Sequence, residues 1–188
     1  MNINRVWAMP SRETFKIKPI RELLEDELSY GKWSNSPFKI ILDYPIEVVI
    51  DPFAGNNSPA GFTNDINPEI ETGKTMDALD YLKTFKNNYA YCILLDPPYS
   101  ITQAKECYAG YGMDKLNIKP TSMKYWAEIK NEMARIINPG GKAICFGWNS
   151  MGLGKNRGFE MKRILLVPHG GSKNDTIVTV ERKIKGLF

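Results

Sequence analysis

A short segment that could carry chemistry follows an apolar run of the chain: Asp96, Pro97, Pro98 and Tyr99 come directly after residues 91–95. Two consecutive prolines can neither donate to a sheet ladder nor continue a helix, so the expected strand stops at Asp96 and a stiff loop begins. Such a loop holds a carboxylate, carbonyl oxygens and an aromatic ring in fixed positions. Together these groups suit a planar ligand that bears an amine.

Three further aspartates lie at the ends of expected strands. Asp51 and Asp65 each end a strand-like segment, and Asp77 directly follows another. In open α/β sheets, ligands bind beyond the carboxyl ends of the strands, near the switch in strand order. We therefore expect the four aspartates to gather at one edge of a sheet as part of a ligand site.

The elements that would position this edge alternate along the chain. Residues 18–28 predict an amphipathic helix that opens with Pro19, and two more helices are expected at 78–85 and 122–137, the latter ended by "NPGG". Seven strands are expected, near residues 47–51, 61–66, 74–76, 89–96, 142–148, 161–168 and 176–183. This alternation predicts a mostly parallel α/β sheet. The short loop between the last two strands predicts an antiparallel C-terminal hairpin at one sheet edge.

Four motifs occur in order along the chain: "DPFAG" at 51–55, "NDIN" at 64–67, "MDALDYL" at 76–82 and "DPPY" at 96–99. In this order they resemble the motifs of the amino-methyltransferases that methylate adenine N6 in DNA, in a small, phage-like, stand-alone form. "FKIKPIREL", ahead of the first motif, is similar to the N-terminal helix segment of that family. The resemblance implies a Rossmann-like methyltransferase sheet of about seven strands, and a single catalytic domain over residues 1–188 without a separate target-recognition domain.

The resemblance also implies S-adenosylmethionine as the cofactor, with no metal. The loop from Asp51 to Gly55 would take its methionine end, Asp65 its ribose hydroxyls and Asp77 its adenine. The full set of cofactor-binding residues implied is Lys18, Asp51, Pro52, Phe53, Ala54, Gly55, Asp65, Asn67, Asp77 and Ala78. A carboxylate at a strand end is also how nucleotide riboses are bound in dinucleotide-binding folds. Asp77 is equally expected to be the N-cap of the helix that follows it.

The same resemblance makes Asp96, Pro97, Pro98 and Tyr99 the catalytic residues. The exocyclic nitrogen of adenine is a poor nucleophile, because its lone pair is delocalised into the ring. The Asp96 carboxylate and the Pro97 carbonyl can accept its two hydrogens, which positions it for attack on a methyl sulfonium. Tyr99 can stack on a base that has been flipped out of a duplex. The expected activity is that of a site-specific, adenine-specific DNA methyltransferase.

The chain departs from the family pattern after the first motif. Asn57 stands where a second glycine is expected, and Pro59 follows it. The connections after the first two motifs are too short for the helical crossovers that parallel strands normally need. Two crossover helices are therefore expected to be missing or reduced to single turns, which leaves the detail of cofactor binding open.

DNA is the expected partner, and contacts with it are expected from residues 100–120, the stretch near Trp33 and residues 169–175. His169, the single histidine, is expected to be a turn residue. The short crossovers leave part of the sheet with little cover, and exposed apolar surface of this kind favours association. We therefore expect a homodimer or a complex with a partner protein.

Two other functions remain open at this level. Some ribosomal RNA methyltransferases that modify guanine N2 share an Asp-Pro-Pro-aromatic motif, although "DPF" in the first motif argues mildly against them. A catalytically weak scaffold that binds nucleic acid or a partner enzyme is the other alternative, and the altered glycine loop favours it.

The bulk composition sets wide limits. The net charge of +4 is compatible with a nucleic-acid partner but too small to argue for one. The three cysteines show no metal-ligand spacing, and Cys92 and Cys145 are expected to be buried thiols. No signal peptide or membrane-spanning stretch is expected. The expected location is the cytoplasm of a bacterium or a phage-infected host cell.

Overall fold

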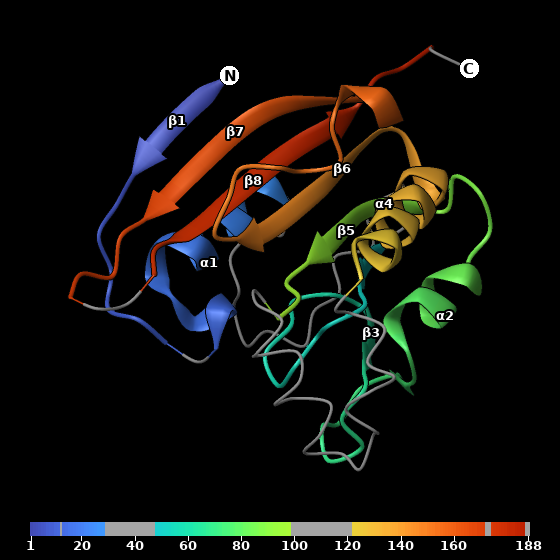
Figure 1. The fold of residues 1–188 in the computed structure, drawn as a ribbon, viewed down its shortest axis with the longest axis horizontal. Coiled ribbons are helices and arrows are strands. Elements are labelled where there is room, and N and C mark those ends of the chain that lie inside the picture. Colours follow the sequence, from blue (N-terminus) through green and yellow to red (C-terminus); the bar gives the residue numbers. More distant parts are fainter. Residues whose placement is uncertain (12, 29–47, 99–121, 172–173, 187–188) are drawn as a thin grey trace, which may run out of the picture.

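The computed structural model describes residues 1–11, 13–28, 48–98, 122–171 and 174–186. These residues form an eight-stranded sheet in the order β1-β7-β8-β6-β5-β2-β3-β4, with helices on both faces (Figure 1). The strands are β1 (Asn2–Arg5), β2 (Val49–Asp51), β3 (Phe62–Asp65), β4 (Lys74–Thr75), β5 (Ala90–Leu95), β6 (Ile137–Gly147), β7 (Phe159–Val167) and β8 (Thr176–Lys183). The helices are α1 (Lys18–Glu27), α2 (Ala78–Lys83) and α4 (Met123–Ile136), with two 3-10 turns, η1 (Thr14–Lys16) and η3 (Lys155–Arg157).

The sheet confirms the predicted fold class. Every neighbouring pair of strands is parallel except the two pairs that β8 makes with β6 and β7. All seven expected strands are present, and β7 and β8 form the expected antiparallel hairpin. The predicted place of the hairpin was wrong in one respect. The N-terminal segment adds β1 as an eighth strand outside β7, so β1 and not the hairpin forms that edge.

Helix α1 covers one face of the sheet. It begins with Pro19 in its first turn, and its apolar residues recur at helical spacing, so that Ile20, Leu23 and Leu24 are at most 1% exposed. These side chains pack against strand residues such as Leu94 and Ile144. Burial of each such side chain contributes about 1.5–3 kcal/mol. The predicted amphipathic helix is thereby confirmed.

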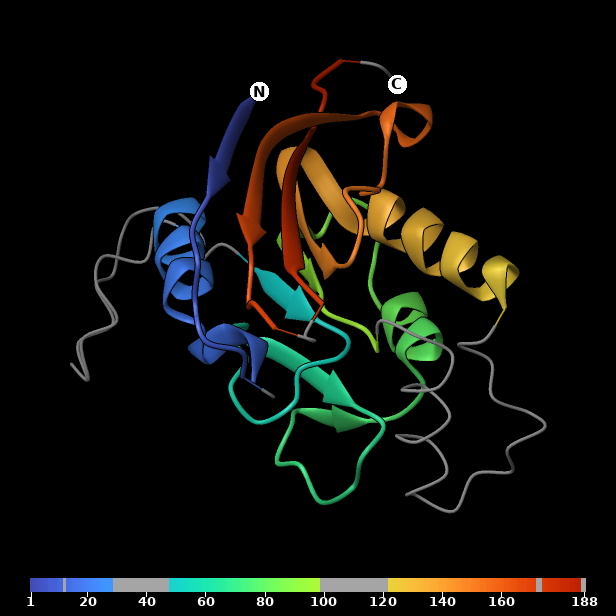
Figure 2. The ribbon, with the colours of Figure 1, turned by 60° about the vertical axis from the view of Figure 1, so that its left-hand side comes forward.

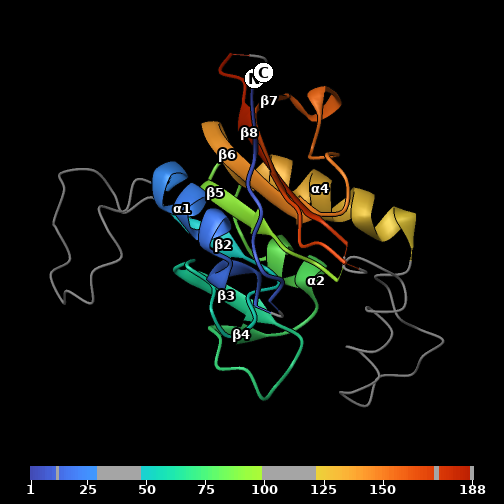
Figure 3. The ribbon, with the colours of Figure 1, turned by 90° about the vertical axis from the view of Figure 1, so that its left-hand side faces the viewer.

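Helices α2 and α4 cover the opposite face, and Figures 2 and 3 show the sheet between them and α1. In α4 the buried residues Tyr125, Ile129, Met133 and Ile136 again follow the helical period. The helix starts at the cap Ser122, whose hydroxyl accepts the Lys124 amide at 3.2 Å. It ends at Ile136, just ahead of the predicted stop "NPGG". The extended backbone of Ile137 leads directly into β6, and "NPGG" belongs to that strand.

Three connections in the described part of the chain lack the helix that would cover a strand. Residues 52–61 and 66–73 contain no helix, which confirms the expected loss of both early crossovers. Residues 148–158, between β6 and β7, hold η3 alone. In Figure 1, β1 and β7 therefore face the viewer with no helix in front of them, while α1 lies behind the sheet.

Two further expectations concern single residues and the membrane. Cys92 and Cys145 are buried free thiols, as predicted, whereas Cys107 lies outside the described residues. Among the described helices, none has both the length and the apolar character needed to cross a bilayer.

Candidate active site

The predicted aspartates lie along one edge of the sheet. Asp51 and Asp65 are the last residues of the neighbouring parallel strands β2 and β3, and Asp96 directly follows β5, the neighbour of β2 on its other side. Asp77 follows β4 and precedes α2. Because these strands are parallel, their carboxyl ends meet at the same edge. Between β2 and β5 the chain changes the direction in which it adds strands, and such switch points are where α/β sheets bind ligands.

Asp51 is the most deeply placed of the four. Its side chain is fully buried, and its oxygens accept the Phe53 amide at 3.0 Å and the Ser58 hydroxyl at 2.6 Å. Burial raises the pKa of this carboxyl to about 7, although the two hydrogen bonds oppose the shift. The negative charges of Asp96 and Asp65 add to the increase in pKa, so the three carboxylates form one electrostatic group.

Asp65 shapes the loop that follows β2. One of its oxygens accepts the Gly55 amide at 3.0 Å, and the other accepts the Asn67 amide at 2.9 Å. Gly55 has φ +52°, a conformation that L side chains rarely adopt, and nothing lies within 4 Å of the position that a Cβ would take there. Each carboxylate oxygen can accept a second hydrogen bond. Asp65 can therefore hold this loop and still accept hydroxyl groups of a ligand.

Asn64 also holds the site together, and no role was predicted for it. It is fully buried in β3, and its amide nitrogen donates to the carbonyls of Pro52 at 3.1 Å and Met76 at 3.0 Å. Its side-chain oxygen accepts the Met76 amide at 3.1 Å. The side chain thus links the segments that follow β2 and β4. The "NDIN" motif contained a signal for this role, because a buried amide needs several partners.

Asp77 caps helix α2, as one of its two expected roles required. One oxygen accepts the amides of Leu79 at 3.0 Å and Asp80 at 3.3 Å. The other oxygen accepts the Tyr125 hydroxyl of α4 at 3.3 Å. Ala78, which starts the helix, is buried. This carboxylate therefore joins α2 to α4 beside the carboxyl edge of the sheet.

Aromatic rings line the region next to the first motif. The ring of Phe53 lies 5.9 Å from that of Trp126, and Trp126 lies edge-on to Tyr125 at 5.3 Å. Trp126 was expected to face the core, and it does pack partly buried against the core on the α4 face. It therefore helps to cover that core and also contacts the first motif.

The segment after β2 takes its shape from side-chain hydrogen bonds. The Asn57 amide, at the position where a glycine was expected, donates to Glu13 at 2.6 Å, and Glu13 also pairs with Lys16 of η1 at 2.6 Å. Ser58 is held by Asp51, as described above. The N-terminal segment and the first motif are therefore connected by a contact between residues 44 positions apart in sequence.

The remaining predicted residues are placed as follows. Pro97 and Pro98 are half-buried beyond the end of β5, next to Asp96, and Tyr99 lies outside the described residues. Asn67 is buried, and its side-chain oxygen accepts the Glu69 amide at 2.9 Å. Lys18, at the start of α1, is exposed and lies 3.8 Å from Glu22.

Most of the segments expected to contact DNA lie outside the described residues. Residues 100–120 and Trp33 lie outside the described residues, as do two residues of the 169–175 segment. His169 is buried, and its ring nitrogens form hydrogen bonds with the Ala8 carbonyl and the Thr176 hydroxyl, each at 2.9 Å. It therefore anchors the segment after β7. Within the described ranges, no cluster of three or more His, Cys, Asp or Glu side chains is arranged to hold a metal ion.

Comparison with known proteins supports the fold. No protein-family model and no curated protein sequence matches the chain. A SAM-dependent methyltransferase from Archaeoglobus fulgidus matches with a TM-score of 0.55 and 9% identity, covering 88% of this chain and 94% of that one. TrmN from Thermus thermophilus matches with a TM-score of 0.54 and 15% identity over 89% of this chain. The chain spans about half of the length of TrmN, 49%. At these identities the likeness establishes a Rossmann-like methyltransferase fold.

Proposed function

We propose that this chain transfers a methyl group from S-adenosylmethionine to N6 of adenine in DNA. The observation that carries the proposal is the group formed by Asp51, Asp65 and Asp96 at the switch point of a methyltransferase sheet. A cofactor with hydroxyl groups and a cationic methionine end needs acceptors of this kind. A target amine needs one further acceptor beside them.

The described residues fit the cofactor. Asp65 anchors the loop from Asp51 to Gly55 by accepting the Gly55 amide, and there is free space beside Gly55. We assign the methionine end to this loop, the ribose hydroxyls to Asp65 and the adenine to the region of Asp77. Asn67 and Ala78 lie close to Asp65 and Asp77 in sequence, and Lys18 completes the proposed set of cofactor-binding residues. Asp51 stays buried and keeps the loop in register through Phe53 and Ser58.

The proposed chemistry depends on position more than on strong base catalysis. The Asp96 carboxylate and the Pro97 carbonyl accept the two hydrogens of the target amine, which directs its lone pair toward the methyl group. A bond forms between the amine nitrogen and the methyl carbon while the bond from that carbon to sulfur breaks. The nitrogen then loses one proton to solvent or to Asp96. Pro98 keeps the loop rigid, and Tyr99 stacks on the base.

Guanine N2 in ribosomal RNA is the second candidate target. The acceptor pair at Asp96 and Pro97 suits either exocyclic amine, so the described part of the site supports both bases. A scaffold without catalysis is the third candidate. Isothermal titration calorimetry with S-adenosylmethionine separates it from both enzymes, since a scaffold with a degraded cofactor loop would release no binding heat.

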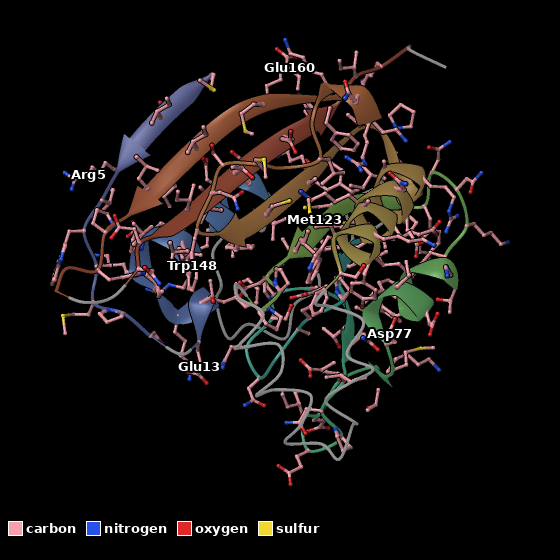
Figure 4. All side chains as sticks on the ribbon, viewed as in Figure 1. Arg5, Glu13, Asp77, Met123, Trp148 and Glu160 are labelled. Atoms are coloured by element: carbon pink, nitrogen blue, oxygen red, sulfur yellow. The ribbon has the colours of Figure 1, made fainter. Side chains whose placement is uncertain are left out.

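The deciding experiment is transfer of a tritiated methyl group into defined DNA and RNA, followed by digestion to nucleosides. The expected product is N6-methyladenine from DNA. Label in N2-methylguanine from RNA would replace the first candidate with the second. Glu160, near the start of β7 and on the opposite side of the molecule from Asp77 (Figure 4), offers a matched control. Glu160→Ala should retain activity, whereas Asp96→Ala should lose it. Absence of transfer by the wild type into any substrate, with no cofactor binding, would contradict an enzyme.

A further inference from the structure

The outer edge of β1 is a second feature of the molecule that could bind a partner. β1 pairs with β7 on one side, and in the described part of the chain no strand pairs with its other side. The amides just after β1, Val6 and Ala8, donate toward the β7 side at 2.9 and 3.1 Å. Successive amides of a strand point to opposite sides. The N–H and C=O groups of Ile3 and Arg5 therefore face outward.

The side chains of β1 extend the two faces of the sheet. Ile3 lies opposite Ile164 of β7, on the face away from α1, and it is 55% exposed. Asn4 lies opposite Leu165, which packs with α1, so the asparagines point to the α1 face. Arg5 points away from the sheet (Figure 4). Ile3 and Ile164 thus form an apolar pair on the uncovered face, with Ile3 exposed at the edge.

Apart from its charged Arg5 and its length of four residues, this edge has none of the features that protect most edge strands. Natural sheets protect their edges with lysine, proline, bulges or very short strands. The β1 sequence, Asn-Ile-Asn-Arg, contains neither proline nor lysine, and its pairing with β7 is regular. The opposite edge of the sheet differs, because β4 has two residues and includes the exposed Lys74. The two ends of the sheet therefore differ in their capacity to pair.

We propose that β1 pairs antiparallel with β1 of a second copy of this chain, about a two-fold axis perpendicular to the sheet. In the register that sets the two Ile3 residues opposite each other, each donates its N–H to the carbonyl of the other. Arg5 then lies opposite Met1 and not opposite another arginine. The axis preserves both faces of the sheet, so the apolar pair of Ile164 and Ile3 meets the same pair of the second copy.

A second copy fits this edge better than an unrelated strand, because the strand is complementary to itself. One register satisfies the outward backbone groups, joins the two Ile3 side chains and keeps the two Arg5 side chains apart. Pairing of β1 with β4 would build an open filament, whereas pairing of β1 with β1 closes after two copies. The edge is also far from the carboxylate group in the sheet order, so the inference is independent of the proposed function.

The first test is the mass of the full chain in solution, measured by light scattering coupled to size exclusion at micromolar concentration. The wild type should have the mass of two chains. Ile3→Lys places a charge at the two-fold axis and should halve the mass. Met123→Lys is the matched control, because Met123 is 89% exposed on α4 and should leave the mass unchanged. A monomeric wild type, or a dimer that Ile3→Lys does not dissociate, would overturn the proposal.

The second test measures the register directly. It also tests the pairing of β1 with β1 if circular dichroism shows that Ile3→Lys is unfolded. Opposite residues in a hydrogen-bonded antiparallel pair have Cα atoms ~5.5 Å apart. That separation lies within the ~4.4–6.8 Å that a disulfide spans. Ile3→Cys should therefore form an oxidised dimer, whereas Met123→Cys and the oxidised wild type should not. Equal crosslinking of all three proteins, or none by Ile3→Cys, would contradict the pairing.

Discussion

The two halves of the sheet are built by different means. The half formed by β2, β3, β4 and β5 has short strands, and buried polar side chains such as Asp51 and Asn64 connect its loops. The part formed by β6, β7 and β8 has long strands, with apolar residues on the α1 face and a single shift of register in the β7–β8 pairing. We infer that β6, β7 and β8 contribute most of the stability of the fold. In β2 to β5, burial of the polar side chains that position the carboxylates lowers that stability. The predictions below test this division, from the largest expected effect to the smallest.

Substitutions in the core of β6, β7 and β8 should lower stability without changing cofactor binding. Leu165→Ala removes a side chain that is 3% exposed between β7 and α1, and it should lower the free energy of unfolding by about 2–5 kcal/mol. Cofactor affinity of the folded fraction should not change. Urea unfolding and calorimetry on the same sample check both statements. A large loss of cofactor affinity would mean that the two halves are not separable.

The carboxylate half should make stability depend on pH through Asp51. Its folded-state pKa is raised to about 7, above the ordinary value for an aspartate, so the unfolded chain releases this proton at lower pH than the folded chain does. The contribution of Asp51 to the free energy of unfolding is therefore greatest below about pH 4. It is lost as pH rises toward 7, by up to ~4 kcal/mol. The stability difference between wild type and Asp51→Asn should follow this trend in urea unfolding at several pH values. A difference that does not change with pH would contradict the raised pKa.

Asp96 should affect the reaction more than the fold. Asp96→Ala removes an acceptor for the target amine, and turnover should fall by roughly two orders of magnitude or more, as for other positioned polar groups at reacting centres. Cofactor affinity should stay close to that of the wild type. Unchanged methyl transfer by this variant would remove Asp96 from the proposed mechanism.

Asp65 should affect the cofactor more than the reaction step. Asp65→Ala takes a charged acceptor from the ribose hydroxyls and frees the Gly55 amide, so binding should weaken by about 1–3 kcal/mol. Calorimetry with S-adenosylmethionine measures this loss. A greater loss in Asp96→Ala than in Asp65→Ala would reverse the assignment of cofactor and target along the edge.

Asp77 should give the smallest effect of the series. Asp77→Ala removes the cap of α2 and the contact with Tyr125, and it should cost about 1 kcal/mol of stability. Asp77→Asn keeps a side-chain oxygen for the cap and should recover most of this loss in thermal unfolding. A loss of cofactor affinity shared by both variants would support the proposed contact with adenine; stability changes alone would leave Asp77 as a structural cap.

The sequence by itself determined the elements with strong local signals. The helical spacing of Ile20, Leu23 and Leu24 predicted α1, and Pro97 with Pro98 fixed the end of β5. Aspartates at the ends of parallel strands had to share an edge, because parallel strands end on the same side. The alternation of elements then predicted the sheet, and the lengths of the loops predicted the lost crossovers.

Tertiary structure alone decided what depends on distant partners. The alternation of Met1 to Asn4 is too short to predict a strand, and β1 is a strand because β7 offers an edge to pair with. The burial that raises the pKa of Asp51 comes from packing around the sheet, and the bond between Glu13 and Asn57 joins segments far apart in the chain. Local sequence patterns reflect the conformational preferences of residues that are close together in the chain. Burial, charge proximity and long-range pairing arise only once the whole chain has folded, and these contacts give the aspartates their environment.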